Sequence, residues 1–392
     1  MTKLIFTSSA LIVGMMLAAP ATALVITPVF DQSITSMANS SAIQAAFIAV
    51  AKDYAQSFSS SANVRIGVSW GSVGGQVLPS NAVGASLNNL YGYYSYSQVK
   101  TMLSRVASAN PGDVALIAAL KYLPTTLTSG PTSFVISSAQ AKALGVISPT
   151  QSSLDASIGF AGSTSNYAFT PGAVTASTYD FQSIAAHEID EVLGRISGVD
   201  NGKWRTPFDL FRYSAPGVLS YGYNSAAYFS LDGGATVLNR FNNSASGGDR
   251  GDWATTAGTS DIQDAFIGKG QRKNLSAVDL AALDVIGWSG ANLGNASGGP
   301  KGIAFNLDGT VPEPATWALL ITGFGLVGAT QRRRRAAGGG RIGGVDFDYI
   351  ADNDDGSCLS ARLSLSAPSH VNHSRRGNPS GAGLARSPPA AA

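Results

Sequence analysis

The chain has 392 residues, of which 44% are hydrophobic and 13% charged, with 45 glycines; this suits one large domain or two ordinary ones. The net charge of +2 comes from the ends, because residues 24–311 hold 16 Lys and Arg against 18 Asp and Glu. A near-neutral central region excludes nucleic-acid binding through a basic face. The only cysteine, Cys358, excludes an intrachain disulfide, so the folded part depends on its core.

The first 23 residues have the three parts of a secretory signal. Lys3 supplies the positive charge, Leu4–Ala19 is mostly apolar, and "PATA" ends in a small-x-small site. Removal by signal peptidase after Ala23 is therefore expected. The alternative, an N-terminal membrane anchor, is disfavoured because Thr7–Ser9 interrupts the apolar run.

The exported region, residues 24–300, alternates helical and strand patterns. Apolar residues recur at three- and four-residue steps over residues 41–58, which predicts an amphipathic helix, and "NVRIGVSW" alternates as a half-buried strand does. No repeat has a solenoid or propeller period. The mixture predicts a single α+β domain. Its other expected elements are helices at 98–106, 113–120, 139–144 and 276–287, strands at 132–137 and 154–160, and a hairpin at 226–238 that turns at Asp232-Gly233.

The stretch "FQSIAAHEIDEVLGR", residues 181–195, predicts a helix that can be capped by Thr178 or Asp180 and is ended by Gly194. His187 and Glu191 lie four residues apart, so both side chains can reach one metal ion. Glu188 points beside that ion, where a general base acting on metal-bound water is placed.

Glutamate usage favours a functional site over an ordinary acidic surface helix. The whole chain contains three glutamates, namely Glu188, Glu191 and Glu313, and two of them lie one and four residues after the only histidine between residues 24 and 311. Because that region has no cysteine, the ligands other than His187 must be oxygen donors. The single histidine also disfavours a serine protease, whose nucleophile needs a histidine base of its own.

The third metal ligand is predicted to be Asp209 in "PFDLF", which follows the helix after a loop that can fold back. The competing interpretation is that Asp209 pairs with Arg205 or Arg212 or caps a turn. The other candidate ligands are Asp190, Asp200, Asp249 and Asp252. Asp249 and Asp252 also lie in a long polar loop, where they can bind calcium or be ordinary solvated turn residues.

Residues 301–310 are expected to be a linker, and residues 311–335, "VPEPATWALLITGFGLVGATQRRRR", combine a Pro-Glu-Pro triplet, a short apolar stretch and four arginines. The apolar stretch is short for a transmembrane helix, which needs about 20 residues, and the arginines favour a cytoplasmic C-terminal side. The segment closely resembles the PEP-CTERM sorting signal of Gram-negative bacteria. That resemblance implies exosortase as a partner, transient anchoring in the inner membrane, and delivery to the cell surface or the medium.

Residues 336–392 are rich in Gly, Ser, Ala, Pro and Arg. This composition is typical of disordered segments, and the stretch follows a signal that normally ends at its arginines. We therefore expect a disordered or aberrant, frame-shifted tail.

The motif "HEIDEVLG" is similar to the zinc-binding helix of zincins, with Glu191 where the second histidine usually stands. Gly194 falls where metzincins turn the chain toward a third ligand, a position taken here by Ser197. With "DLFRYSAPG", "YFSLDGG", "GDWA" and "ALDVIGW", the region 177–288 resembles a family of PEP-CTERM-bearing bacterial metalloproteases. The resemblance implies a zincin-like domain around a central active-site helix, with His187, Glu191 and Asp209 as zinc ligands and Glu188 as catalytic base.

Two hypotheses about function follow. The first is an exported zinc peptidase acting on a peptide substrate. The second is a catalytically inactive zincin-fold protein of the surface or of an extracellular polysaccharide matrix, which suits the low charge and the many glycines. Oxygen-rich ligation also relaxes selectivity toward manganese or calcium, and the second hypothesis needs no metal.

Overall fold

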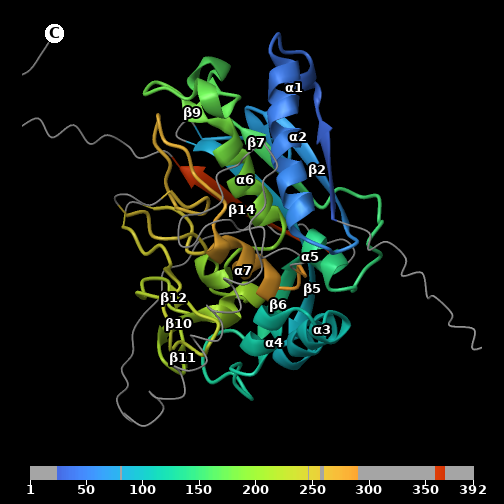
Figure 1. The fold of residues 1–392 in the computed structure, drawn as a ribbon, viewed down its shortest axis with the longest axis vertical. Helices are drawn as coiled ribbons and strands as arrows, with labels where there is room; N and C mark the ends of the chain where they lie inside the picture. Colours follow the sequence, from blue (N-terminus) through green and yellow to red (C-terminus); the bar gives the residue numbers. More distant parts are fainter. Residues whose placement is uncertain (1–23, 80–81, 246, 257–259, 290–357, 367–392) are drawn as a thin grey trace, which may run out of the picture.

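A mixed sheet packed against helices forms the centre of the molecule (Figure 1). The computed structural model describes residues 24–79, 82–245, 247–256, 260–289 and 358–366. The strand order is β1-β2-β7-β5-β14, and β6 also pairs with β5. These strands are β1 (Val25–Phe30), β2 (Asn63–Trp70), β5 (Ala82–Ser95), β6 (Ser133–Ser137), β7 (Ala156–Phe160) and β14 (Cys358–Ser366).

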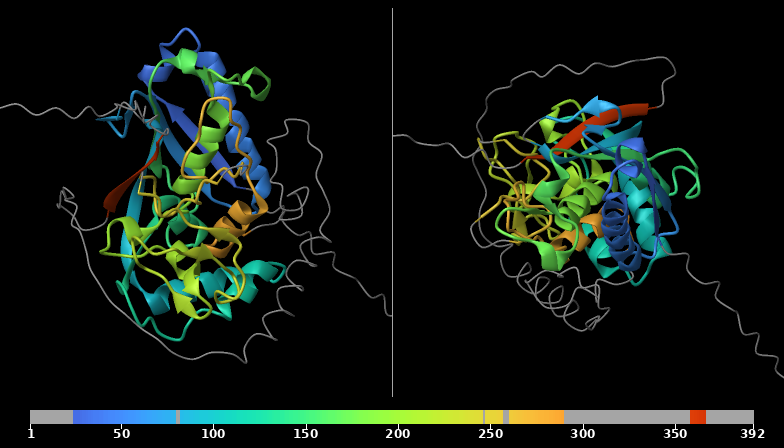
Figure 2. Two further views of the ribbon diagram at one scale, coloured as in Figure 1. Left: turned by 90° about the vertical axis from the view of Figure 1, so that its left-hand side faces the viewer. Right: turned by 90° about the horizontal axis from the view of Figure 1, so that it is seen from above.

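Strand β5 is the longest of these and joins the two halves of the sheet. β1, β2 and β7 run parallel to one another, whereas β5 is antiparallel to β7, β6 and β14. One side of β5 pairs first with β7 and then with β6, and the opposite side pairs with β14. Leu90 and Tyr91 accordingly have partners on both sides. Figure 2 shows β14 along the margin of the sheet.

Side-chain caps satisfy the free backbone N–H groups at the starts of several helices. Asp113 caps α4 by accepting from Leu116 N, and Ser95 and Gln98 form a capping box at the start of α3. α2 buries a stripe that includes Ile43, Phe47 and Tyr54. The helices are α1 (Gln32–Thr35), α2 (Ser40–Ser57), α3 (Tyr96–Ala109), α4 (Val114–Leu120), α5 (Ser138–Ala143), α6 (Phe181–Val192) and α7 (Ala277–Val285).

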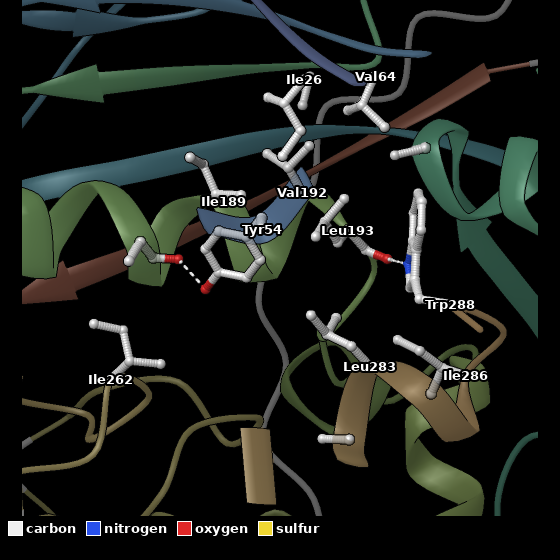
Figure 3. Packing of buried hydrophobic residues seen from close by; sticks show 14 of the residues in the cluster. Ile26, Tyr54, Val64, Ile189, Val192, Leu193, Ile262, Leu283, Ile286 and Trp288 are labelled. Atoms are coloured by element: carbon white, nitrogen blue, oxygen red, sulfur yellow. Dashed lines mark hydrogen bonds between the residues drawn. The ribbon is translucent and has the colours of Figure 1, made fainter. Parts of the chain in front are cut away.

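Helix α6 lies in the core, where it packs against β5 of the sheet and against α2 (Figure 1). All of its residues are buried. The Tyr54 hydroxyl donates to Ala186 O at 2.9 Å, and Trp288 Nε1 donates to Leu193 O at 2.5 Å, so α2 and the segment after α7 both anchor the α6 backbone (Figure 3). The sequence stretch 181–195, expected to be helical, is thus confirmed as a buried helix.

Beyond α6 the chain forms short helical turns and a small antiparallel sheet of order β11-β10-β12-β13. The hairpin expected at 226–238 is present as β12 paired with β13, but its loop is longer than a two-residue turn. Asp232 closes that loop by accepting hydrogen bonds from Thr236 N and Oγ1. The elements here are η3 (Gly198–Asp200), η4 (Pro207–Phe211), β10 (Arg212–Ala215), β11 (Val218–Leu219), β12 (Tyr228–Phe229) and β13 (Asn239–Arg240).

Two further two-stranded sheets and two short 3-10 helices complete the described part of the chain. β3 pairs antiparallel with β4, and β8 pairs in parallel with β9 just before α6. Their bounds are β3 (Ser72–Val73), β4 (Gln76–Val77), β8 (Tyr167–Ala168), β9 (Tyr179–Asp180), η1 (Thr164–Asn166) and η2 (Pro171–Ala173).

The α+β class is confirmed, and the C-terminal region differs from the prediction at one place. Within the expected disordered tail, Cys358–Ser366 forms β14. Leucine or alanine alternates with polar residues from Leu359 to Leu365, the period of a strand, and β5 offers a free side for pairing. The expected signal peptide at residues 1–23, the linker at 301–310 and the sorting helix at 311–335 lie outside the described residues. No helix within the described ranges is long and apolar enough to span a membrane.

Candidate metal centre

Local contacts fix both ends of α6, the helix that carries His187, Glu188 and Glu191. Asp180 is the N-cap, and its carboxylate accepts hydrogen bonds from Gln182 N at 3.3 Å and from Ser183 Oγ at 2.7 Å. At the other end Gly194 has φ +104°, and a Cβ there would lie 3.0 Å from Gln140 Oε1. Only glycine suits such a turn. The chain therefore leaves α6 sharply, and Arg195 N bonds back to Asp190 O at 3.2 Å.

His187 is fully buried and held in one tautomer. Its Nδ1 lies 2.9 Å from Ile262 O, and a carbonyl oxygen can only accept, so Nδ1 carries the proton in that bond. In the neutral ring Nε2 then carries a lone pair. That atom lies 3.6 Å from Glu191 Oε1 and 3.7 Å from Asp252 Oδ1. A backbone carbonyl that orients the other ring nitrogen is the usual support of a metal-binding histidine.

Asp252 completes a group of three donors. His187, Glu191 and Asp252 each offer one atom, and the three atoms lie within 4.8 Å of one another. Asp252 lies in the loop between β13 and α7. The backbone of the next residue, Trp253, forms isolated β-bridges with Phe241 and Asp264. Among the described residues, neither Asp252 oxygen nor His187 Nε2 has a hydrogen-bond partner. Buried polar atoms without partners are rare, and here they face one another.

Two of the three donor separations fit a small divalent cation. In a tetrahedral zinc site, ligand atoms about 2.1 Å from the ion lie about 3.4 Å apart, close to the 3.6 and 3.7 Å measured from His187 Nε2. Glu191 is oriented by Ser86 of β5, whose hydroxyl donates to Glu191 Oε2 at 2.7 Å. One imidazole and two carboxylates also suit manganese, because oxygen-rich sites favour hard cations.

Glu188 lies beside this group on the side that faces β5. Both of its carboxylate oxygens are buried without a hydrogen-bond partner in the described part of the chain. A Cβ on Gly84 of β5 would lie 2.7 Å from Glu188 Oε1, so the strand can approach this carboxylate only because residue 84 is glycine. Burial, and then the charges of Glu191, Asp249 and Asp252, raise the pKa of Glu188 well above its ordinary value.

The same electrostatics act on the donors themselves. Burial alone lowers the pKa of His187, but the charges of Asp252 and Glu191 outweigh burial and raise it to about 9. Burial raises the pKa of Asp252 to about 7, against the opposing charges of His187 and Arg195. Without an ion, the group therefore shares protons among its members, and a divalent cation would replace those protons.

Asp209, predicted to be the third ligand, lies elsewhere. Its carboxylate accepts hydrogen bonds from Ser197 Oγ at 2.5 Å, Gly198 N at 2.9 Å and Thr206 N at 2.8 Å. It thus holds the loop after α6 and caps η4, which was the competing interpretation. The loop after α6 does fold back, but its own backbone N–H groups hydrogen-bond to the Asp209 carboxylate. Asp252 is the aspartate that lies beside His187 and Glu191.

The remaining candidates also have other surroundings. Ser197, at the third-ligand position of the metzincin pattern, donates to Asp209 and caps η3. Asp200 accepts from Arg250 N at 3.1 Å. Asp190 faces Arg195, whose Nε lies 3.7 Å from Asp190 Oδ2. Sequence reasoning missed the roles of Ser86 and Ile262 O, since a lone serine or a backbone carbonyl leaves no recognisable pattern.

Comparison with known proteins identifies the sorting segment. Residues 310–335 match the family described as the PEP-CTERM protein-sorting motif. The motif indicates export and sorting to the cell surface in Gram-negative bacteria, with recognition by exosortase. No curated protein and no solved structure matches the chain.

Proposed function

We propose that this surface-sorted protein is a metal-dependent peptidase whose metal ligands are His187, Glu191 and Asp252. One observation carries the proposal, namely three buried donor atoms within 4.8 Å of one another, including a histidine nitrogen whose lone pair faces two carboxylates. Zinc is the first candidate by the resemblance of "HEIDEVLG" to zincin helices, and manganese is the second by the donor set.

Each residue has a distinct role in this proposal. An ion held by the three donors supplies Lewis acidity toward a peptide carbonyl and toward water. Glu188, in its ionised form, accepts the proton of the attacking water and later returns it to the leaving amine. Ser86 keeps Glu191 turned toward His187 by donating to the other carboxylate oxygen.

A second candidate function has one observation in its favour. The exposed fractions of His187, Glu188, Glu191 and Asp252 are all 0 or 1%. A peptide can reach these residues only if a neighbouring segment moves. An inactive surface protein that uses the same three donors for a structural ion needs no such opening.

The experiment that separates the two candidates uses purified protein with and without chelator. Elemental analysis decides whether the wild type holds a stoichiometric metal, and cleavage of a casein-type substrate decides whether it is a peptidase. Glu188→Gln should keep the metal and lose about 10²–10⁴-fold in turnover, because an amide cannot take the water's proton. Asp53→Asn on α2, which makes the same carboxyl-to-amide change away from the three donors, is the control for the loss of a carboxyl group.

The outcomes are distinct. Bound metal with chelator-sensitive cleavage that Glu188→Gln abolishes supports the peptidase. Bound metal without cleavage in either protein supports the structural-ion candidate. A wild type that binds neither zinc nor manganese contradicts both metal roles.

A further inference from the structure

Arg195 is a buried cation beside the candidate metal centre. It follows Gly194 at the turn that ends α6, and its exposed fraction is 1%. Its guanidinium lies 4.2 Å from the centroid of the Trp253 ring and 5.0 Å from that of Phe208. Two aromatic rings thus hold the plane of the guanidinium in place by cation–π contact.

The same guanidinium lies beside Asp190 of α6 and beside Asp252, so it is close to both segments that carry metal donors. Nη1 lies 4.0 Å from Asp252 Oδ1 and donates a hydrogen bond to Gln263 Oε1. Gln263 Nε2 in turn donates to His187 O at 3.0 Å. Arg195 therefore links the α6 backbone at His187, the 262–263 segment and the loop that carries Asp252.

Asp252 has few other restraints. Neither carboxylate oxygen has a hydrogen-bond partner among the described residues. The cations within ion-pair distance of it in the described part of the chain are His187 and Arg195. When His187 serves as a neutral ligand, Arg195 is the cation that remains beside Asp252.

We propose that Arg195 is a positioning residue that holds the Asp252 carboxylate toward His187 and Glu191. The proposal rests on the proposed function in one respect, that Asp252 is a metal ligand. In the metzincin pattern the turn at Gly194 leads to a third ligand. Here it leads to Arg195, whose guanidinium orients a ligand, Asp252, from another part of the chain.

Positioning and simple electrostatics predict effects of opposite sign on metal affinity. Removal of a positive charge about 4 Å from a ligand favours a bound cation by Coulomb's law and therefore tightens binding. Loss of a residue that orients a ligand weakens binding, usually by about 10–100-fold. The direction of the change in Kd therefore distinguishes the two roles.

The first test is structural and needs no metal. Crystal structures of the metal-free full chain are compared for the wild type, Arg195→Gln and Arg205→Gln. Arg205 is the matched control, since it is equally buried and stacks on the Tyr221 ring at 4.4 Å, but it donates to Pro131 O away from Asp252. We expect Asp252 Oδ1 to move away from its 3.7 Å separation from His187 Nε2 only in Arg195→Gln.

The second test is the affinity for zinc and manganese, measured by competition with a chromophoric chelator. Arg195→Gln should raise Kd about 10–100-fold, Arg195→Lys should recover part of the loss, and Arg205→Gln should not change Kd. In a double-mutant cycle, Asp252→Asn should cost less affinity in the Arg195→Gln background than in the wild type. If Arg195→Gln does not fold, Arg195→Lys carries both tests, because it keeps the charge and loses the planar guanidinium.

An Asp252 carboxylate that keeps its place in Arg195→Gln overturns the proposal, and so does an unchanged or lower Kd. A wild type that binds no metal while Asp252 still moves in Arg195→Gln contradicts the metal function but supports the positioning role. Failure of one proposal is thus distinguishable from failure of the other.

Discussion

His187 Nε2 and Asp252 Oδ1 lie 3.7 Å apart, although one belongs to α6 and the other to the loop between β13 and α7. The contact requires that loop to pack against the side of α6 that carries His187 and Glu191. Trp253 secures it, because its Nε1 donates to Asp279 Oδ1 at 2.8 Å and its ring stacks on Arg195. The metal donors thus come from two segments that only the fold brings together.

This relationship predicts that alanine at position 252 lowers metal affinity, whereas alanine at position 209 lowers stability. Asp252→Ala should weaken zinc binding at least about 10-fold and leave the melting temperature of the metal-free protein nearly unchanged or higher, because the buried Asp252 carboxylate accepts no hydrogen bond in the described part of the chain. Asp209→Ala should cost about 2–4 kcal/mol of stability, since four donors of Ser197, Gly198 and Thr206 lose their acceptor.

Metal affinity and thermal unfolding of the two variants, measured side by side, check this prediction. A metal Kd that rises in Asp209→Ala while Asp252→Ala binds normally would restore the prediction made from sequence, with Asp209 as the ligand.

The metal-free protein should become less stable as the pH rises. The folded-state pKa of Asp252 is about 7 against an ordinary 3.8, that of His187 is about 9 against 6.5, and that of Glu188 is also raised. Between the two values of each group, the folded chain binds more protons than the unfolded chain, so the free energy of unfolding falls with increasing pH. The slope is at most about 1.4 kcal/mol per pH unit for each group.

Urea unfolding of chelator-treated protein between pH 4 and 9 measures this slope. Glu188→Gln should flatten it by removing one contributing carboxyl group. Added zinc should stabilise the protein more at high pH, because the ion replaces the shared protons. A stability that rises with pH without metal would show that the carboxyl groups are ionised at little cost in the fold.

Glu191→His should bind zinc more tightly than the wild type. The change restores the usual H-E-x-x-H motif and replaces an anionic ligand by a neutral imidazole, which leaves the ion a stronger Lewis acid. Glu191→Gln is the matched comparison, since it also removes the charge but offers a poorer donor, and it should bind zinc more weakly.

Zinc competition titrations rank the three proteins. Equal affinities in all three would mean that residue 191 is not a ligand, whatever its distance from His187.

Gly194→Ala should destabilise the protein by about 1–3 kcal/mol and lower its metal affinity. An alanine at φ +104° is strained, and its Cβ would meet the Gln140 side chain at 3.0–3.1 Å. Gly145→Ala is the control, because Gly145 also has a positive φ of +65° but a Cβ there has no neighbour within 4 Å. It should cost about 1 kcal/mol and leave metal binding unchanged.

Chemical denaturation and metal titration of both variants test this pair. An equal loss of stability with equal metal affinity would show that the turn serves only to end the helix.

The pairing of β14 predicts an alternating pattern of amide exchange in β5. Over Ala82–Asn89, amides directed to β7 should stay protected in a chain that ends at Val311, whereas those directed to β14 should exchange faster than in the full chain. Residue-resolved hydrogen exchange of the two proteins provides the measurement. Identical exchange in both would show that Cys358–Ser366 does not pair with β5 in solution.

Local patterns in the sequence determined much of the secondary structure. The apolar spacing of Ile43, Phe47 and Val50 yields α2, and the alternation in "NVRIGVSW" yields β2, since each periodicity suits one backbone geometry. The cap at Asp180 and the turn at Gly194 are local as well, as is the placement of His187 and Glu191 on one helix face. β5 was missed, because its small residues and asparagines show no such period.

Only the tertiary structure decided which aspartate joins that helix face. Asp209 is nearer in sequence, but backbone donors of its own loop occupy its carboxylate, whereas Asp252 is carried to His187 by the packing of Trp253 and Arg195. Likewise, the Ile262 carbonyl that selects the His187 tautomer is an ordinary backbone group in the sequence. Side-chain type and spacing are local properties, but a metal centre depends on distances between segments, which are set by how the whole core packs.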